Sequence, residues 1–111
     1  MKMQLTKFNP REEVVTIEDA KFTIRSVKAA TLVSIQVSAG NGDFETAAMV
    51  AIRNGVTGVE GLTDADGKEI KSGKQLWSAL YDAGPEASPI ITELSTSVIE
   101  KSQIKEDTAK N

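Results

Sequence analysis

The chain has 111 residues, of which 40% are hydrophobic and 5% aromatic, and its formal net charge is −3. This length suits one domain, and the scarcity of aromatic residues means that aliphatic side chains must fill most of the core. Histidine and cysteine are absent, which excludes imidazole bases, thiol nucleophiles, disulfides and the usual zinc sites. The few large side chains expected in the core are Phe8, Phe22, Phe44, Trp77 and Tyr81.

The distribution of charge and hydropathy argues against two further classes of partner. Residues 1–53 carry seven Lys or Arg against six Asp or Glu, whereas residues 54–111 carry six against ten. Neither half has the dense basic stripe that nucleic-acid binding requires. The first eight residues contain too short an apolar run for a signal peptide, and no later segment approaches a membrane span. We therefore expect a cytoplasmic protein that binds neither nucleic acid nor membrane.

Residues 14–27 alternate apolar and polar positions around the polar centre Glu18–Lys21, which predicts a β-hairpin. Its apolar face carries Ile17, Phe22 and Ile24. Because two strands alone are only marginally stable in water, this face needs a cover. We expect helices that contain residues 44–52 and 76–81 to provide it.

Two helices are predicted in the middle of the chain. Residues 29–39 place apolar side chains at helical spacing before Gly40-Asn41-Gly42, although residues 33–37 also alternate as a strand would. Asp43 is the N-cap of the second helix, which ends near Asn54-Gly55. Small residues let another helix approach closely, so its apolar face either packs inside the domain, which we favour, or meets another subunit. That face consists of Phe44, Ala47, Ala48, Ala51 and Ile52.

A glycine-rich connector, residues 54–70, separates these helices from the next. Apolar residues between its glycines predict an ordered segment and not a free linker. Within it, Asp64–Glu69 looks like part of a calcium loop, but Leu62 and Gly73 would then occupy the first and last ligand positions, where neither can coordinate through a side chain. We therefore predict a hairpin turn between Leu62 and Ile70, with no metal and no cofactor.

Two more helices are predicted after the connector. The first begins at Ser72 or Gly73, ends at Gly84-Pro85, and carries Leu76, Trp77, Leu80 and Tyr81. The second spans residues 85–101, with its apolar side formed by Ile90, Ile91, Leu94, Val98 and Ile99. Residues 103–111 are polar and are expected to form a flexible tail after a single globular domain, residues 1–102. The predicted class is α+β, with an N-terminal β-hairpin packed on three to four short helices.

Trp77 and Tyr81 have two interpretations. These residue types dominate binding hot spots, yet a sole tryptophan in an aromatic-poor domain is more often part of its core, which we favour. If a partner surface exists on the predicted helices, we expect Ala47, Ala48, Ala51, Trp77 and Tyr81 to form it. No residue is assigned a catalytic function.

The sequence of residues 51–70 resembles a pattern common in the small tail assembly chaperones of long-tailed bacteriophages and prophages. In that pattern a helix ends in Gly-Val-x-Gly-hydrophobic-Glu-Gly, a turn Asp-x-Asp-Gly-Lys follows, and the next helix contains Leu or Trp. The layout continues through Pro85 and Leu94 to the polar tail ending in Lys110-Asn111. Val59 stands where an aromatic residue is often found.

The resemblance implies a non-enzymatic factor of the bacterial host cytoplasm that binds the tape-measure protein, assists tail-tube assembly and is absent from the finished particle. Self-association into a homo-oligomer is compatible with it. Two alternatives differ in testable ways. A small structural or adaptor protein would remain in the virion, and an enzyme using carboxylates would gather perturbed acids in a cleft.

Overall fold

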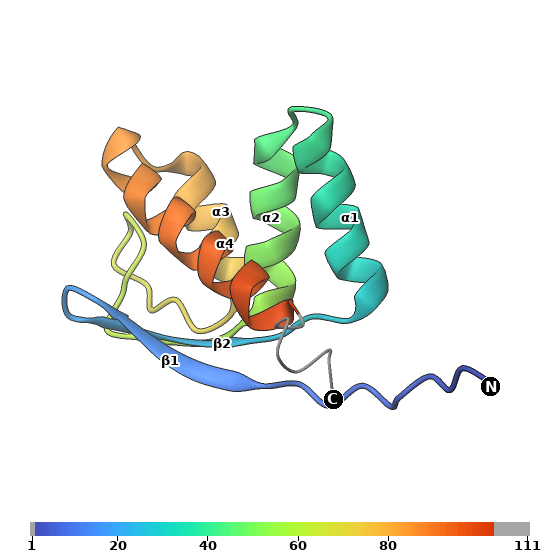
Figure 1. Ribbon diagram of the computed structural model, residues 1–111. Helices are drawn as coiled ribbons and strands as arrows, with labels where there is room; N and C mark the ends of the chain where they lie inside the picture. The colour runs from blue at the N-terminus through green and yellow to red at the C-terminus, as the bar shows by residue number, and fades with distance from the viewer. Residues whose placement is uncertain (1, 104–111) are drawn as a thin grey trace.

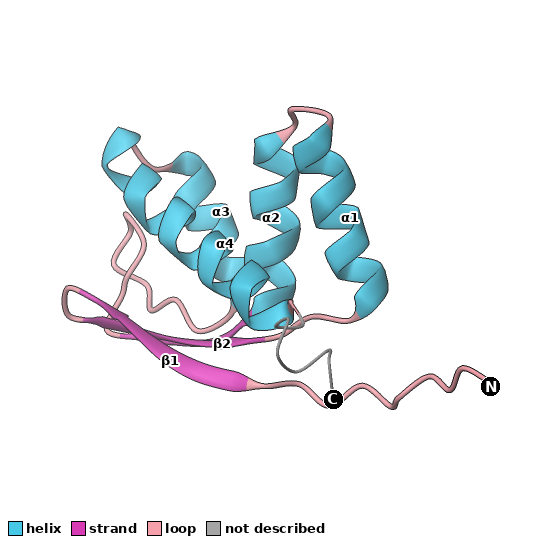
Figure 2. Ribbon diagram, in the orientation of Figure 1, coloured by secondary structure: helices cyan, strands magenta, loops and turns pink. Residues whose placement is uncertain are grey.

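The computed structural model describes residues 2–103, which fold into a three-stranded antiparallel sheet with four α-helices on one face (Figure 1). The two layers are seen most clearly when the chain is coloured by secondary structure (Figure 2). This architecture confirms the α+β class with an N-terminal hairpin. In chain order the elements are β1 (Glu12–Ile17), β2 (Ala20–Arg25), α1 (Ala29–Gly40), α2 (Phe44–Gly55), β3 (Val56–Glu60), α3 (Gly73–Asp82), the 3-10 turn η1 (Pro85–Ala87) and α4 (Ser88–Ser102).

The predicted hairpin is formed by β1 and β2. Ile17 lies opposite Ala20, so the turn has two residues, and Glu18 within it has a φ of +53°. Alternation along β2 buries Phe22 and Ile24 on the helix side of the sheet and leaves the opposite face to solvent. Val15 and Ile17 of β1 are partly buried against the same core.

The third strand, β3, was not predicted. It pairs antiparallel with β2, so β2 is the central strand of the sheet. Phe22 lies opposite Val59 and Ile24 opposite Val56, with an irregularity between Thr23 and Ile24. The extra residue on β3 interrupts the two-residue period that identifies a strand, and Gly58 further hides it. The glycine-rich connector, residues 54–70, thus contains the end of α2, the strand β3 and a loop.

The cover of the sheet differs in part from the prediction. α4 lies across β2 and β1, whereas the strand that α2 and α3 chiefly contact is β3. The hairpin is therefore covered chiefly by the last helix, although all of these elements contribute to one core. That core consists of Ala20, Phe22, Ile24, Val27, Ile35, Ala47, Ala51, Ile52, Val56, Val59, Ile70, Leu76, Leu80, Ala87, Leu94 and Val98.

α2 is the central helix and contacts α1, α3, α4 and β3. Ala47 and Ala51 are buried on it, so the small-residue face serves packing within the domain. α2 and α4 approach closely at Gly55, where an added Cβ would lie 2.5 Å from Cγ2 of Val98 on α4. Glycine is required there because a side chain would collide with the facing helix.

The aromatic residues correct the expected core. Of the five, Phe22 alone is buried, and Trp77 is half-buried against the core. Phe44 is 69% exposed and Tyr81 63% exposed, and Phe8 is also exposed. Phe44 is the first residue of α2, at the end of the helix that is far from the sheet (Figure 1), so helical spacing alone assigned it wrongly to the core.

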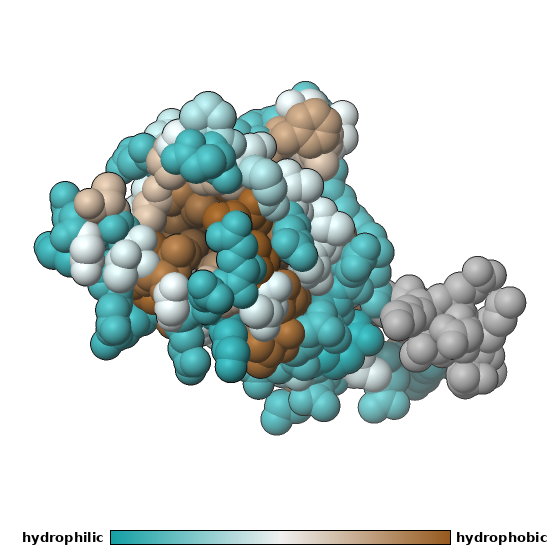
Figure 3. Space-filling model, turned by 90° about the vertical axis from the view of Figure 1, so that its left-hand side faces the viewer, coloured by the Kyte–Doolittle hydropathy of each residue, from teal (hydrophilic) through white to brown (hydrophobic). Residues whose placement is uncertain are grey.

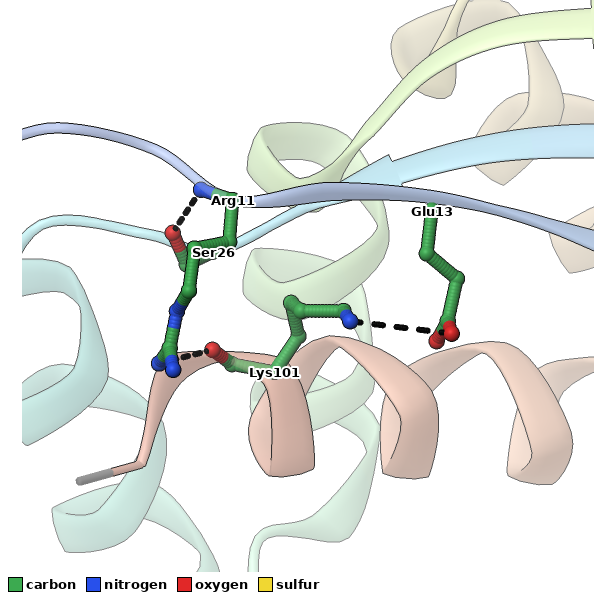
Figure 4. A network of polar contacts seen from close by, with 4 residues as sticks. All are labelled: Arg11, Glu13, Ser26 and Lys101. Atoms are coloured by element: carbon green, nitrogen blue, oxygen red, sulfur yellow. Dashed lines mark hydrogen bonds and ion pairs between the residues drawn. The ribbon is translucent and has the colours of Figure 1, made fainter. Parts of the chain in front are cut away.

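Polar contacts fasten the end of α4 to the start of the hairpin (Figure 4). Nη2 of Arg11 donates to the carbonyl oxygens of Lys101, at 2.6 Å, and Gln103, at 3.2 Å. The Arg11 backbone N–H donates to Oγ of Ser26, and Lys101 forms an ion pair with Glu13. A cation at carbonyls that lack helical partners is favourable, because these groups form the negative end of the helix dipole.

Local signals read from the sequence are confirmed at three places. Asp43 caps α2 by accepting the Thr46 N–H, and these contacts with Thr46 lower the pKa of Asp43. Ser72 caps α3, and residues 29–40 form a helix and not the alternative strand. Most of the expected tail, residues 104–111, lies outside the described residues.

Candidate functional site

A hollow on the described surface lies between the 62–70 loop, α3 and the start of α4. We call it the α3–α4 groove, and its volume is about 710 Å³. On the face of the molecule that carries it, apolar residues form a recessed patch surrounded by hydrophilic ones (Figure 3). An exposed hollow with an apolar floor is a typical binding surface.

The floor of the groove comes from two stripes of α3 and from the elements that face them. Leu76 and Leu80 are buried and tie α3 to the core, whereas Ala79 lies on the neighbouring stripe and Ala83 is the C-cap residue that follows α3. Because a methyl group fills little space, these alanines leave room between α3 and its neighbours. Leu62, Ile70, Ala87 and Ile90 complete the apolar lining.

One wall of the groove is a tight hairpin turn within residues 62–70, as predicted. The N–H of Ile70 donates to the carbonyl of Leu62, and Thr63 pairs with Glu69. Oδ1 of Asp64 accepts the N–H groups of Asp66 and Lys68 at 2.9 and 3.0 Å. Gly67 adopts a φ of +83°, which the turn requires and glycine permits. The side chain of Asp64 therefore serves the shape of the wall.

The rim of the groove is acidic. Five carboxylates and two ammonium groups line it, and all but Asp64 belong to exposed residues. Such a rim favours a ligand that combines apolar groups with positive charge, because opposite charges at the edge orient an incoming partner. The acidic residues are Asp64, Asp66, Glu69, Asp82 and Glu86, and the basic ones are Lys68 and Lys74.

The residues expected to bind a partner lie elsewhere. Ala47 and Ala51 are buried and Ala48 is half-buried, so α2 presents little of this face to the surface. Trp77 and Tyr81 are brought together, with ring centroids 6.0 Å apart and planes tilted by 50°. They line a second hollow, of about 420 Å³, with Met49 and Glu45 of α2.

Sequence reasoning missed the groove because Ala79 and Ala83 carry no chemical signal by themselves. The usable signal was the i, i+4 pair Ala79 and Ala83 beside a leucine stripe. Ala87 and Ile90 follow at the start of the next helix, and acidic residues flank both segments. Only the fold shows that the 62–70 turn closes one side of this stripe.

The described residues offer little else of chemical interest. Across residues 2–103, no three His, Cys, Asp or Glu side chains gather as a metal site would require. In the same range no helix combines the length and apolar content needed to cross a membrane. Further apolar exposure occurs at Val33 and Val37 of α1 and Val14 of β1.

Comparison with known proteins returned nothing: no family model, curated protein or solved structure matches the chain. The functional interpretation therefore rests on the residues and their geometry, together with the resemblance of residues 51–70. Of these features, the α3–α4 groove says most about which kind of ligand the protein can bind. It is a surface suited to hold an apolar segment with basic flanks.

Proposed function

We propose that this protein is a non-enzymatic tail assembly chaperone of a long-tailed phage or prophage. In this proposal the α3–α4 groove holds an apolar segment of the tape-measure protein. The observation that carries the proposal is the groove itself, which is open, apolar at its floor and acidic at its rim. The resemblance of residues 51–70 to tail assembly chaperones suggests the tape-measure protein as the client.

The chemistry of the groove supports a helical client. An amphipathic helix binds a groove of this kind by inserting side chains from one face, and basic residues beside that face would meet the rim. Each Leu or Val side chain fully buried in this way contributes about 1.5–3 kcal/mol. A few such side chains are enough for transient binding, which suits a factor that must leave before the particle is complete.

The composition supports binding over catalysis. The sequence has no histidine and no cysteine, which are the commonest bases and nucleophiles near neutral pH. Among the rim carboxylates, Asp64 is engaged by two backbone N–H groups that shape its own turn. We accordingly assign the groove no reaction.

The proposal places the protein in the bacterial host cytoplasm, where it binds the tape-measure protein and helps to recruit the tail-tube subunit. It makes no contact with nucleic acid or membrane and is released from the finished particle. A structural or adaptor protein, the alternative, would be retained as a stoichiometric component.

Co-expression with the neighbouring tail genes, followed by pull-down, tests this function. We expect the tape-measure protein to be retained by the wild type and by Ala30→Arg, and lost with Ala83→Arg. Both alanines are exposed, but Ala83 lines the groove and Ala30 lies on α1. Equal retention by both variants would show that the groove is not the site.

Purified mature particles provide the second readout. The chaperone function predicts that this chain is missing from them, whereas a structural function predicts a fixed copy number. Its stoichiometric presence in virions, or failure to retain any tail protein in the pull-down, contradicts the proposed function.

A further inference from the structure

The N-terminal arm, residues 2–10, lies outside the domain that it precedes. It forms no helix or strand and extends away from the start of β1 (Figure 1). Met3 is 91% exposed and Leu5 is 89% exposed, and Phe8 is also exposed. Three large apolar side chains on one short extended segment are costly to leave in water, so the arm has the composition of a ligand.

The charge of the arm is complementary to the α3–α4 groove. The arm contains Lys2 and Lys7 and no acidic residue. The rim of the groove carries five carboxylates and two ammonium groups. An extended segment places Met3 and Leu5 on one side, and Lys2 and Lys7 flank this pair in the sequence. This combination of apolar side chains and positive charge matches an apolar floor with an acidic rim.

The position of the arm directs it to another molecule. It leaves the sheet at the start of β1, whereas the 62–70 loop and α3 lie toward the other end of the molecule (Figure 1). β1 has six residues and spans roughly 20 Å. To enter its own groove, the arm would have to fold back along its own sheet. A second copy presents the same groove without that reversal.

We propose that the N-terminal arm of one copy binds the α3–α4 groove of a second copy. Because each copy carries both an arm and a groove, two copies either exchange their arms in a two-fold dimer or join head to tail, into a ring if the rotation closes and a filament if it does not. A client that enters the groove displaces the arm. Self-association and client binding are then mutually exclusive.

Sedimentation velocity of the purified chain, over a wide range of concentration, tests the inference with two pairs of variants. In the arm, Leu5→Ser removes an apolar side chain and Gln4→Ser is the matched control at a neighbouring polar position. In the groove, Ala83→Arg adds bulk and positive charge, and Ala30→Arg is its control on α1. Leu5→Ser and Ala83→Arg are each expected to weaken association about tenfold or more, with both controls unchanged.

Mixing the two defective variants gives the sharpest result. Leu5→Ser retains an intact groove and Ala83→Arg retains an intact arm, so the mixture should form one-to-one dimers and nothing larger. A wild type that stays monomeric at every concentration overturns the inference. So does association that survives Ala83→Arg, as pairing of exposed β1 edges would produce.

This experiment needs no client, so its failure and the failure of the proposed function are distinguishable. If the arm does not bind, the pull-down of the tape-measure protein is unaffected. If the chain associates through arm and groove but retains no tail protein in the pull-down, the inference is confirmed and the proposed chaperone function is wrong.

Discussion

Gly55→Ala tests the packing of the central helix α2 on the last helix, α4. Gly55 is the last residue of α2, and its φ is not in the left-handed region, so alanine suits the backbone. The obstacle is Val98, whose Cγ2 would lie 2.5 Å and whose Cβ would lie 3.0 Å from the new methyl group. Favourable carbon–carbon contacts need about 3.5–4.0 Å.

The cost follows from how little Val98 can move. Its side chain is fully buried, and a β-branched residue in a helix has one strongly preferred rotamer. The helices must therefore separate slightly, and such overpacking costs about 1–3 kcal/mol. Replacing glycine in a helix returns up to about 1 kcal/mol. We expect a net loss of about 1–2 kcal/mol, or a fall in Tm of roughly 4–16 °C.

Chemical denaturation of a four-member set measures this effect. Gly40→Ala is the matched control, because Gly40 also ends a twelve-residue helix but has open space around its Cβ position. It should be neutral or slightly stabilising. Val98→Ala alone creates a cavity and destabilises, whereas Gly55→Ala combined with Val98→Ala should lose less than the sum of the two single changes, by about 1 kcal/mol.

Two results would refute this reasoning. If Gly55→Ala leaves the free energy of unfolding unchanged while Gly40→Ala behaves as expected, α2 and α4 are not in the close contact described. If the double variant is strictly additive, the cost of Gly55→Ala arises elsewhere than at Val98.

Three further predictions concern the termini and the surface. Arg11→Ala should lower the free energy of unfolding by about 1 kcal/mol, because the carbonyls of Lys101 and Gln103 lose a charged donor. An unchanged midpoint of chemical denaturation would show that the contact contributes nothing to stability. Trp77→Ala should lower the free energy of unfolding by about 2 kcal/mol, which is less than the roughly 3–5 kcal/mol for a fully buried ring, because the Trp77 ring is half-buried. Thermal unfolding measures this loss, and a variant that does not fold at all would contradict the half-buried position of the ring. Hydrogen bonds with Thr46 lower the pKa of Asp43, so the stabilisation that its carboxylate provides is fully present above the ordinary Asp pKa of about 3.9 and is lost as pH falls through the lower pKa of the folded state. The free energies of unfolding of the wild type and Asp43→Ala, measured by denaturation across that pH range, should therefore converge at acid pH. A difference that stays constant with pH would argue against the cap.

Much of the fold could be predicted from local sequence. Asp43 and Ser72 mark helix starts because their side chains satisfy N–H groups that have no helical partner. The turn at Asp64–Glu69 follows from the need for a side-chain acceptor and a glycine at fixed positions. The hairpin follows from two-residue alternation that matches one buried face. These features are determined by neighbours a few residues away.

The elements that were missed depend on distant contacts. β3 is defined by its pairing with β2, and its irregular register erases the alternation that would have identified it as a strand. Phe44 has helical spacing with the core but lies on the first turn of α2, beyond the reach of the sheet. The groove requires the 62–70 turn, α3 and α4 to meet around small side chains. None of these positions can be calculated from spacing within one element.

The central claim, that the α3–α4 groove binds a client, is tested most directly by calorimetric titration of the purified protein with the tape-measure protein. We expect saturable binding with a negative heat-capacity change, retained by Ala30→Arg and abolished by Ala83→Arg, because apolar burial in the groove drives the association. Binding of equal affinity to the wild type and to both variants, or no binding to the wild type, would contradict the claim.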